Sequence, residues 1–195
     1  MFTDDEIIQS VRSGKTQNFE LLIQRYGKKI INFINRMIGD ADEAQSLAQD
    51  VFLRVYQGLH RYRLENSFQA FLYRVARNQT LNWIKKNRRL TFFSRLAGHE
   101  LSKAEAADRH HPPEMLETQE QDRLLINALA GLHEEQRLGL IMKTYLELSY
   151  AQIADITGWS VPKIETLISR AKFNLKKNIR AQESQLGIVI KERKR

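Results

Sequence analysis

The most informative stretch of the sequence is residues 149–172, which read SYAQIADITGWSVPKIETLISRAK. Ala154 is small enough to lie where two helices cross. Gly158 follows four residues later and can adopt the left-handed conformation of a tight turn. Ile164 then lies where a second helix must pack back on the first. This spacing predicts a helix-turn-helix, and an ordinary helical hairpin is the alternative.

The second helix of this motif has an aliphatic face and a polar face. With the aliphatic face turned inward, the outer positions hold Lys163, Glu165, Thr166, Ser169, Arg170 and Lys172. Polar groups near the start of a recognition helix read base edges, and cations hold phosphates. Glu165 weakens phosphate binding but can accept a hydrogen bond from a cytosine amino group, and a solvated surface position is its alternative. These six residues form a predicted surface for duplex DNA.

Helical periodicity continues through most of the remaining chain. Thr3 with Glu6, and Ser149 with Gln152, form capping-box patterns that predict two helix starts. An apolar stripe with a 3.6-residue period predicts a long helix and contains Phe19, Leu22, Ile23, Tyr26, Ile30, Phe33, Ile34 and Met37. No segment alternates with a period of two, so the predicted fold class is all-α.

The periodicity weakens once, between residues 91 and 118, where Pro112 and Pro113 also lie. We therefore expect two small helical domains, at residues 1–90 and 119–180, joined by a flexible linker. Residues 181–195 are expected to form a frayed C-terminal tail.

Positive charge is concentrated in one part of the chain. Residues 54–89 hold nine Lys and Arg and one acid, a net charge of +8 that equals the net charge of the whole chain. The flanking ranges 1–53 and 91–118 each carry −2. This cationic block predicts contact with nucleic acid phosphates, with a solvated basic helix face as the alternative.

The same block contains six of the chain's 17 aromatic residues. Tyr73 falls outside the apolar stripe of its helix, so we expect it to be exposed and able to stack on an unpaired base. It lies in phase with a polar and cationic face formed by Arg74, Arg77, Asn78, Asn82, Lys85 and Lys86. Asparagine can hydrogen-bond a base edge, so this face predicts recognition of bases as well as phosphates.

The preceding helix has a different character. Its exposed side carries Asp42, Glu43, Gln49 and Asp50, which would repel DNA and suit a basic protein partner. An ordinary surface helix is the alternative.

Several classes of function are excluded or disfavoured. The chain has no cysteine, which excludes disulfides, iron–sulfur clusters and a thiol nucleophile. Its five histidines lack metal-binding spacing, and no glycine-rich phosphate loop or serine-hydrolase motif is present. We predict a protein that is not an enzyme, with no metal, cofactor or small-molecule substrate. The acidic N-terminus and the absence of a long apolar run predict a cytoplasmic protein with no membrane insertion.

Three runs resemble a known family, the bacterial sigma factors of the extracytoplasmic-function (ECF) type. Residues 44–56, AQSLAQDVFLRVY, resemble the helix that binds core RNA polymerase. Residues 67–78, SFQAFLYRVARN, resemble the promoter-melting helix that follows it. Residues 148–172 are similar to the C-terminal helix-turn-helix of the same family. The order and spacing of the three runs match the family over about residues 3–180.

The resemblance implies a role for each surface. The first domain would bind core RNA polymerase through the motif residues Leu47, Gln49, Asp50 and Phe52. It would also open promoter DNA at the −10 element, with Asn78 and its neighbours holding a flipped base. The second domain would bind the −35 element as duplex. An anti-sigma factor is an implied regulatory partner.

Some positions depart from the family pattern. Pro162, Glu165 and Leu167 stand where many members have glycine, a basic residue and arginine, and His133 replaces a common proline. These departures bear on the −35 sequence preference. The alternative function is a helix-turn-helix regulator that binds duplex DNA without polymerase.

Overall fold

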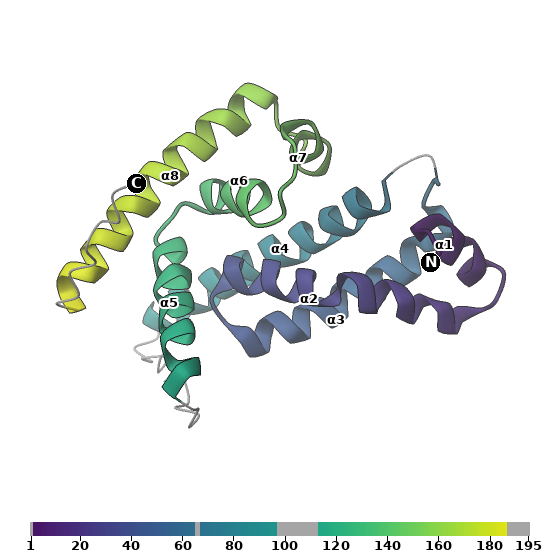
Figure 1. Ribbon diagram of the computed structural model, residues 1–195, viewed down its shortest axis with the longest axis horizontal. Helices are drawn as coiled ribbons and strands as arrows, with labels where there is room; N and C mark the ends of the chain where they lie inside the picture. The colour runs from purple at the N-terminus through teal and green to yellow at the C-terminus, as the bar shows by residue number, and fades with distance from the viewer. Residues whose placement is uncertain (1, 65–66, 97–112, 187–195) are drawn as a thin grey trace.

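The predicted all-α fold class is confirmed. The computed structural model describes residues 2–64, 67–96 and 113–186, and within these ranges it contains helices and no strand (Figure 1). The α-helices are α1 (Asp4–Arg12), α2 (Phe19–Ile38), α3 (Ala41–Gly58), α4 (Phe68–Leu96), α5 (Pro113–Ala130), α6 (Glu134–Thr144), α7 (Tyr150–Thr157) and α8 (Val161–Leu186). Two short 3₁₀ turns, η1 (Thr16–Asn18) and η2 (Leu59–Arg61), precede α2 and follow α3.

Helices α1 to α4 form the first domain. Helices α2 and α3 lie side by side, and α4 packs against both (Figure 1). Phe33, Ile34, Val51 and Leu72 are fully buried where the three helices meet. The burial of this apolar face is the main stabilising contribution to the domain.

Side-chain bonds attach α1 to the three-helix core. Arg12 donates to the backbone carbonyls of Leu59 and Tyr62 in the connection between α3 and α4. Tyr26 of α2 donates to the Asp4 carboxylate at 2.6 Å. Both ends of the short helix are therefore fixed.

Helices α5 to α8 form the second domain. Leu138 and Ile141 of α6 pack against Ile164 and Ile168 of α8, and all four are buried. Helix α7 ends at Gly158, whose φ of +74° is the left-handed conformation that the sequence predicts for the turn. The helix-turn-helix is therefore formed by α7 and α8.

The predicted helix starts are confirmed by their hydrogen bonds. The backbone N–H of Glu6 donates to the Thr3 hydroxyl at 3.2 Å, and the Thr3 N–H donates back to the Glu6 carboxylate at 2.7 Å. Ser149 and Gln152 make the equivalent reciprocal pair. Each pair satisfies donors that a helix N-terminus would otherwise leave free.

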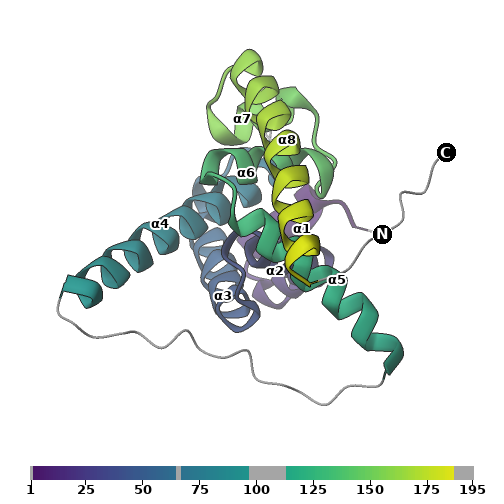
Figure 2. The same ribbon diagram turned by 90° about the vertical axis from the view of Figure 1, so that its left-hand side faces the viewer.

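Helices extend further into the predicted linker and tail than the sequence pattern indicates. Helix α4 continues to Leu96, α5 begins at Pro113 and α8 continues to Leu186. The centre of the predicted linker, residues 97–112, and the tail beyond residue 186 lie outside the described residues. In Figure 2 the C-terminal part of α4 projects away from the helices around it.

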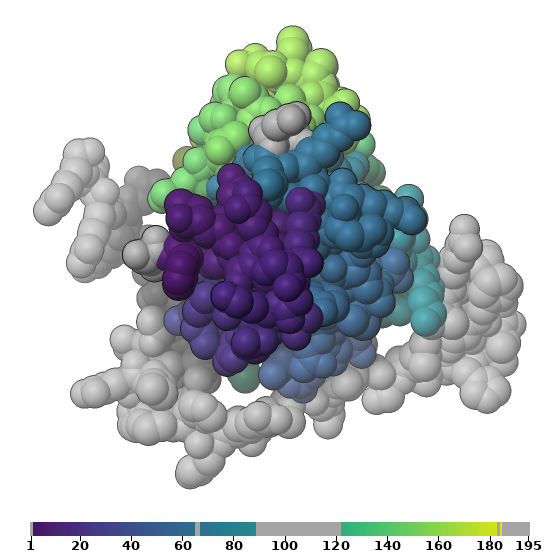
Figure 3. All heavy atoms as spheres, turned by 90° about the vertical axis from the view of Figure 1, so that its right-hand side faces the viewer, coloured from purple at the N-terminus to yellow at the C-terminus, as the bar shows by residue number. Residues whose placement is uncertain are grey.

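The second domain rests on the first. Helices α5 and α6 contact α2, and α7 contacts α4. Figure 3 shows the second domain, in green and yellow, seated against the purple and blue helices of the first. The side chains at this contact determine which of the predicted site residues are exposed to solvent.

Candidate functional site

Helix α3 divides the predicted polymerase-binding motif between two faces. Leu47 and Phe52 are buried, and the Phe52 ring packs edge-to-face on Phe19 of α2 with ring centroids 6.3 Å apart. Gln49 and Asp50 are exposed. A partner can therefore contact the amide and the carboxylate, whereas the two apolar side chains hold the helix against its neighbours.

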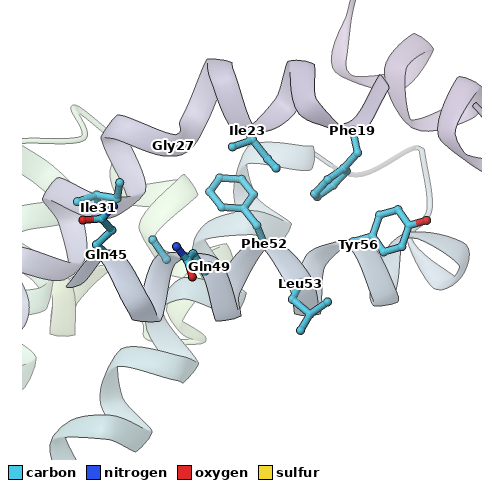
Figure 4. Close-up of a pocket in the computed structure, with 10 residues that line it drawn as sticks. Phe19, Ile23, Gly27, Ile31, Gln45, Gln49, Phe52, Leu53 and Tyr56 are labelled. Atoms are coloured by element: carbon cyan, nitrogen blue, oxygen red, sulfur yellow. The ribbon is translucent and has the colours of Figure 1, made fainter. Parts of the chain in front are cut away.

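An apolar groove of about 400 Å³ lies between α2 and α3, beside the exposed residues of the motif (Figure 4). Gln49 and Phe52 line it together with Leu53 and Tyr56 of α3. The Leu53 side chain is 55% exposed. Leu53 and Tyr56 were not predicted from the sequence. Leu53 could have been recognised, because it is an aliphatic residue that lies outside the apolar stripe of its helix.

The opposite wall of the groove comes from α2. In Figure 4 Phe19 and Ile23 point from α2 toward Phe52. The sequence placed Ile23 on the core stripe, which is wrong, because its side chain is 41% exposed. The apolar stripe of α2 is wider than the surface that α3 covers. The apolar side chains that α3 leaves uncovered form part of this groove.

Helix α4 presents most of the predicted −10-binding residues on one accessible face. Arg77 is half-buried and donates to the side-chain oxygen of Asn78 at 3.3 Å. The exposed members are Arg74, Asn78, Asn82, Lys85 and Lys86. The face therefore combines cations for phosphates with amides that can reach base edges.

The prediction that Tyr73 lies off the core was wrong. Its side chain is 0% exposed and packs edge-to-face on Phe33, with ring centroids 5.9 Å apart. Burial, with a smaller effect from Tyr145 of the second domain, raises the pKa of Tyr73 to about 12. The periodicity of α4 alone does not show that Tyr73 faces both α2 and the second domain. Because the ring is buried, it is not available for base stacking in this conformation.

A second hollow beside α4 adds residues that the sequence reasoning did not select. It has a volume of about 480 Å³ and lies between the start of α4 and the segment that follows α3. Arg61, Arg63 and Arg74 line it, with the Phe71 ring and the Asp155 carboxylate of α7, which pairs with Arg74 at 2.9 Å. Guanidinium groups beside an apolar surface suit a nucleotide, whose phosphate and base need both, although Asp155 occupies Arg74 in this conformation.

The predicted recognition helix lies at the start of α8. Lys163 forms an ion pair with Glu135 of α6, with an N–O distance of 2.9 Å, and the Thr166 hydroxyl donates to the Pro162 carbonyl at 2.9 Å. Glu165, Ser169, Arg170 and Lys172 are exposed. The outward face expected from the sequence is present, although two of its members already have partners.

Trp159, in the turn between α7 and α8, was not selected from the sequence. The Lys163 ammonium lies 4.9 Å from its ring centroid, and the Arg77 guanidinium of α4 lies 6.0 Å from it. Burial lowers the pKa of Arg77. One indole therefore contacts cations from both predicted DNA-binding surfaces.

No cluster of three potential metal ligands was found among the described residues. Within the same part of the chain, no helix is long and apolar enough to cross a membrane.

Comparison with known proteins identifies both domains. Residues 22–90 match the family described as Sigma-70 region 2, and residues 122–174 match Sigma-70, region 4. The RNA polymerase sigma factor YlaC of Bacillus subtilis is 31% identical over 165 residues, which cover 83% of this chain and 92% of YlaC. The chain belongs to the ECF branch of the sigma-70 family. The RNA polymerase sigma-H factor of Pseudomonas aeruginosa is a further relative of this sigma factor, 29% identical over 87% of the chain and 90% of the relative.

Two solved structures share the fold. CnrH, solved in complex with the cytosolic domain of CnrY, aligns with a TM-score of 0.66 at 17% identity over 90% of this sigma factor and 96% of that chain. RpoE, in complex with the anti-sigma factor NepR from Bartonella quintana, aligns with a TM-score of 0.65 at 19% identity, over 84% of this chain and 98% of that chain. These structural similarities establish the fold. They do not establish the contacts of individual residues, which come from the structure of this chain itself.

The different burial of Phe52 and Gln49 predicts different effects of truncation. Phe52→Ala removes a ring packed between α2 and α3, and we expect it to lower the free energy of unfolding by about 3 kcal/mol. Gln49→Ala serves as the control and should change it by less than about 0.5 kcal/mol. Urea unfolding followed by circular dichroism measures both. Equal stability of the two variants would contradict the buried role of Phe52.

Proposed function

We propose that this sigma factor binds core RNA polymerase through the exposed side of α3. The observation that carries the proposal is the separation of two surfaces on adjacent helices. Gln49 and Asp50 lie beside an apolar groove on α3, whereas α4 presents Arg74 and its cationic neighbours. An anionic and apolar surface suits a protein partner, and a cationic surface suits nucleic acid.

The first domain would then recognise and open the −10 element. Asn78 would hold a base extruded from the duplex, and the hollow lined by Arg61, Arg63 and Arg74 would hold the adjoining strand. Unstacking a base-pair step costs about 1–2 kcal/mol. Capture of the extruded base in a stacked and hydrogen-bonded position returns about 1–3 kcal/mol, which is enough to balance the opening of a step.

The second domain would bind the −35 element as duplex through the start of α8. Ser169, Arg170 and Lys172 are free to approach the major groove and its phosphates. Residues 119–180 carry nine bases and seven acids, a net charge of only +2. The electrostatic affinity of this domain for DNA is therefore small, so polymerase must bring both domains to the promoter together.

An anti-sigma factor is proposed as the regulatory partner. Both solved structures described above contain a bound protein, and one of these bound proteins is called an anti-sigma factor. The surfaces assigned here to polymerase and DNA are the ones that such a partner would need to cover.

Reconstituted transcription tests the function as a whole. Purified protein is added to core RNA polymerase, and promoter-dependent transcripts are measured on a pool of genomic promoter fragments. We expect specific transcripts only when both components are present. Transcripts from core polymerase alone, or specific DNA binding that activates a different holoenzyme, would favour the alternative of a regulator.

The role of α3 is tested by charge reversal. Asp50→Lys places a cation on the surface that we assign to polymerase and should weaken co-purification with core RNA polymerase about tenfold or more. Asp122→Lys makes the same charge change at an exposed position of α5 and should leave co-purification unchanged. Retention of Asp50→Lys at the wild-type level, with both variants folded by circular dichroism, would contradict the assignment.

The role of Asn78 is tested in the open complex. Asn78→Ala removes the amide that would bind the flipped base, and we expect permanganate reactivity of the promoter bubble to fall about tenfold. A template already melted at the −10 element should restore opening but not the preference for its sequence. Asn127→Ala, at an exposed position of α5, is the matched control. An unchanged footprint for Asn78→Ala would show that another residue reads the base.

A further inference from the structure

Arg12, the last residue of α1, binds the backbone that forms one wall of the hollow beside α4. Its Nε donates to the Leu59 carbonyl at 3.0 Å, and its Nη2 donates to the carbonyls of Leu59 and Tyr62. These two acceptors lie at the start of the turn η2 and just after its end, and the Tyr62 N–H closes the turn by donating to the Leu59 carbonyl at 3.1 Å. One planar guanidinium therefore holds both ends of the turn.

The backbone held by Arg12 carries two cations of the hollow. Arg61 and Arg63 line the hollow and are the chain neighbours of Tyr62, which lines it as well. The bond to the Tyr62 carbonyl therefore fixes the backbone from which both arginine side chains extend. The Arg12 side chain is not part of the lining and acts on the hollow only through this backbone.

Aromatic packing holds the same turn against α4. Tyr62 is buried, and its ring centroid lies 5.3 Å from that of Phe71 and 6.0 Å from that of Phe68. Phe71 also packs closely on Gly58, where an added Cβ would lie 3.1 Å from its ring. The Tyr62 side chain is thus held by α4, and its backbone is held by α1.

Helix α1 gives Arg12 a firm support. Its apolar side chains are buried, and α1 lies beside the turn η2 (Figure 1). Asp4 at its other end forms an ion pair with Arg25 of α2 and accepts a hydrogen bond from Tyr26 at 2.6 Å. The match to region 2 begins only at residue 22, so α1 and Arg12 lie before the matched range.

We propose that Arg12 is a positioning residue for recognition of the −10 strand, because it holds residues 59–62 so that Arg61 and Arg63 lie at a fixed distance from the Phe71 ring. This inference rests on the proposed function of the hollow. Phosphate contacts set the register of a strand, and base contacts then read its sequence. A turn that could shift would still attract phosphates but would no longer place each base in register. Loss of Arg12 should therefore lower base selectivity more than overall affinity.

Three variants separate this role from a general structural one. Arg12→Ala removes both bonds to the turn, and Arg12→Lys keeps the charge without the planar group that spans two carbonyls. Arg25→Ala is the matched control, because Arg25 also attaches α1 to the core, and its hydrogen bonds go to Asp4 and to the Phe2 carbonyl rather than to the turn. Co-purification with core RNA polymerase, which we assign to α3, shows that each variant folds.

Amide hydrogen exchange in the full-length proteins tests whether Arg12 holds the turn. Exchange of the Tyr62 amide should accelerate about tenfold or more in Arg12→Ala, because hydrogen bonds to a charged group are lost. It should accelerate less in Arg12→Lys and should stay at the wild-type rate in Arg25→Ala. An unchanged rate in Arg12→Ala would overturn the proposal.

Selectivity for the −10 sequence tests the function of this contact. The probes are the genomic fragment that gives the most transcript in the reconstituted assay and copies of it in which each −10 base is changed in turn. Selectivity is the ratio of open complex, measured by permanganate, on the original and the changed fragments. It should fall about five- to tenfold in Arg12→Ala, be partly restored in Arg12→Lys and stay unchanged in Arg25→Ala. An equal loss of open complex on every fragment would show a purely structural role and overturn the proposal.

The outcome is separable from that of the proposed function. If the wild type gives no promoter-dependent transcripts with core polymerase, the proposed function fails and this inference fails with it. If the wild type is selective and Arg12→Ala selects the same bases, the inference fails alone. If Arg25→Ala loses selectivity as Arg12→Ala does, the attachment of α1 in general is responsible, and the specific role of Arg12 is overturned.

Discussion

The packing of one face of α4 against α2 is the constraint on which the rest of the structure depends. Tyr73 and Phe33 meet at this contact and are both fully buried. Because 3.6 residues make one turn, fixing Tyr73 inward turns Arg74 and Asn78 outward. The same rotation directs Arg77 partly toward the second domain. The packing of this one face of α4 therefore determines the core, the position of the cationic surface and the contact between the domains.

This constraint explains why the two sides of the first domain differ. The side formed by α2 and α3 keeps an apolar groove with Gln49 at its edge, and the side formed by α4 carries cations. A partner protein and a DNA strand can then bind the same small domain without competing for one surface. Helices of the second domain pack against α2 and α4, whereas the groove beside Gln49 is lined by residues of α2 and α3 alone. A partner protein can therefore approach this groove while Asp155 holds Arg74.

Much of the fold follows from local sequence patterns. The capping pair of Thr3 and Glu6, and the turn at Gly158, depend on residues within one helical turn of each other, and both are confirmed. Tyr73 and Ile23 were placed on the wrong side for a different reason. Helical periodicity shows which side of a helix carries the apolar stripe. How much of that stripe is buried depends on which other helices pack against it. Neither the second domain behind Tyr73 nor the open groove beside Ile23 can be seen from one helix.

The candidate site shows the same difference between features that depend on local sequence and features that depend on packing between distant segments. Exposed Gln49, Asp50 and Asn78 were correctly predicted to be available, because charge and amide groups at regular spacing favour the solvent side. Trp159 was missed, since its importance depends on Arg77, which approaches the indole from the other domain. Contacts between distant segments leave no local periodicity, and so they require the structure.

The central claim is that the DNA-reading side chains work only when polymerase positions the two domains. An equilibrium titration of a transcribed promoter fragment, at about 150 mM salt with and without core RNA polymerase, tests it most directly. The account predicts no specific complex at submicromolar concentrations of the protein alone, and a tight specific complex once core polymerase is added. A submicromolar specific complex without polymerase would contradict the account and identify a regulator that binds DNA by itself.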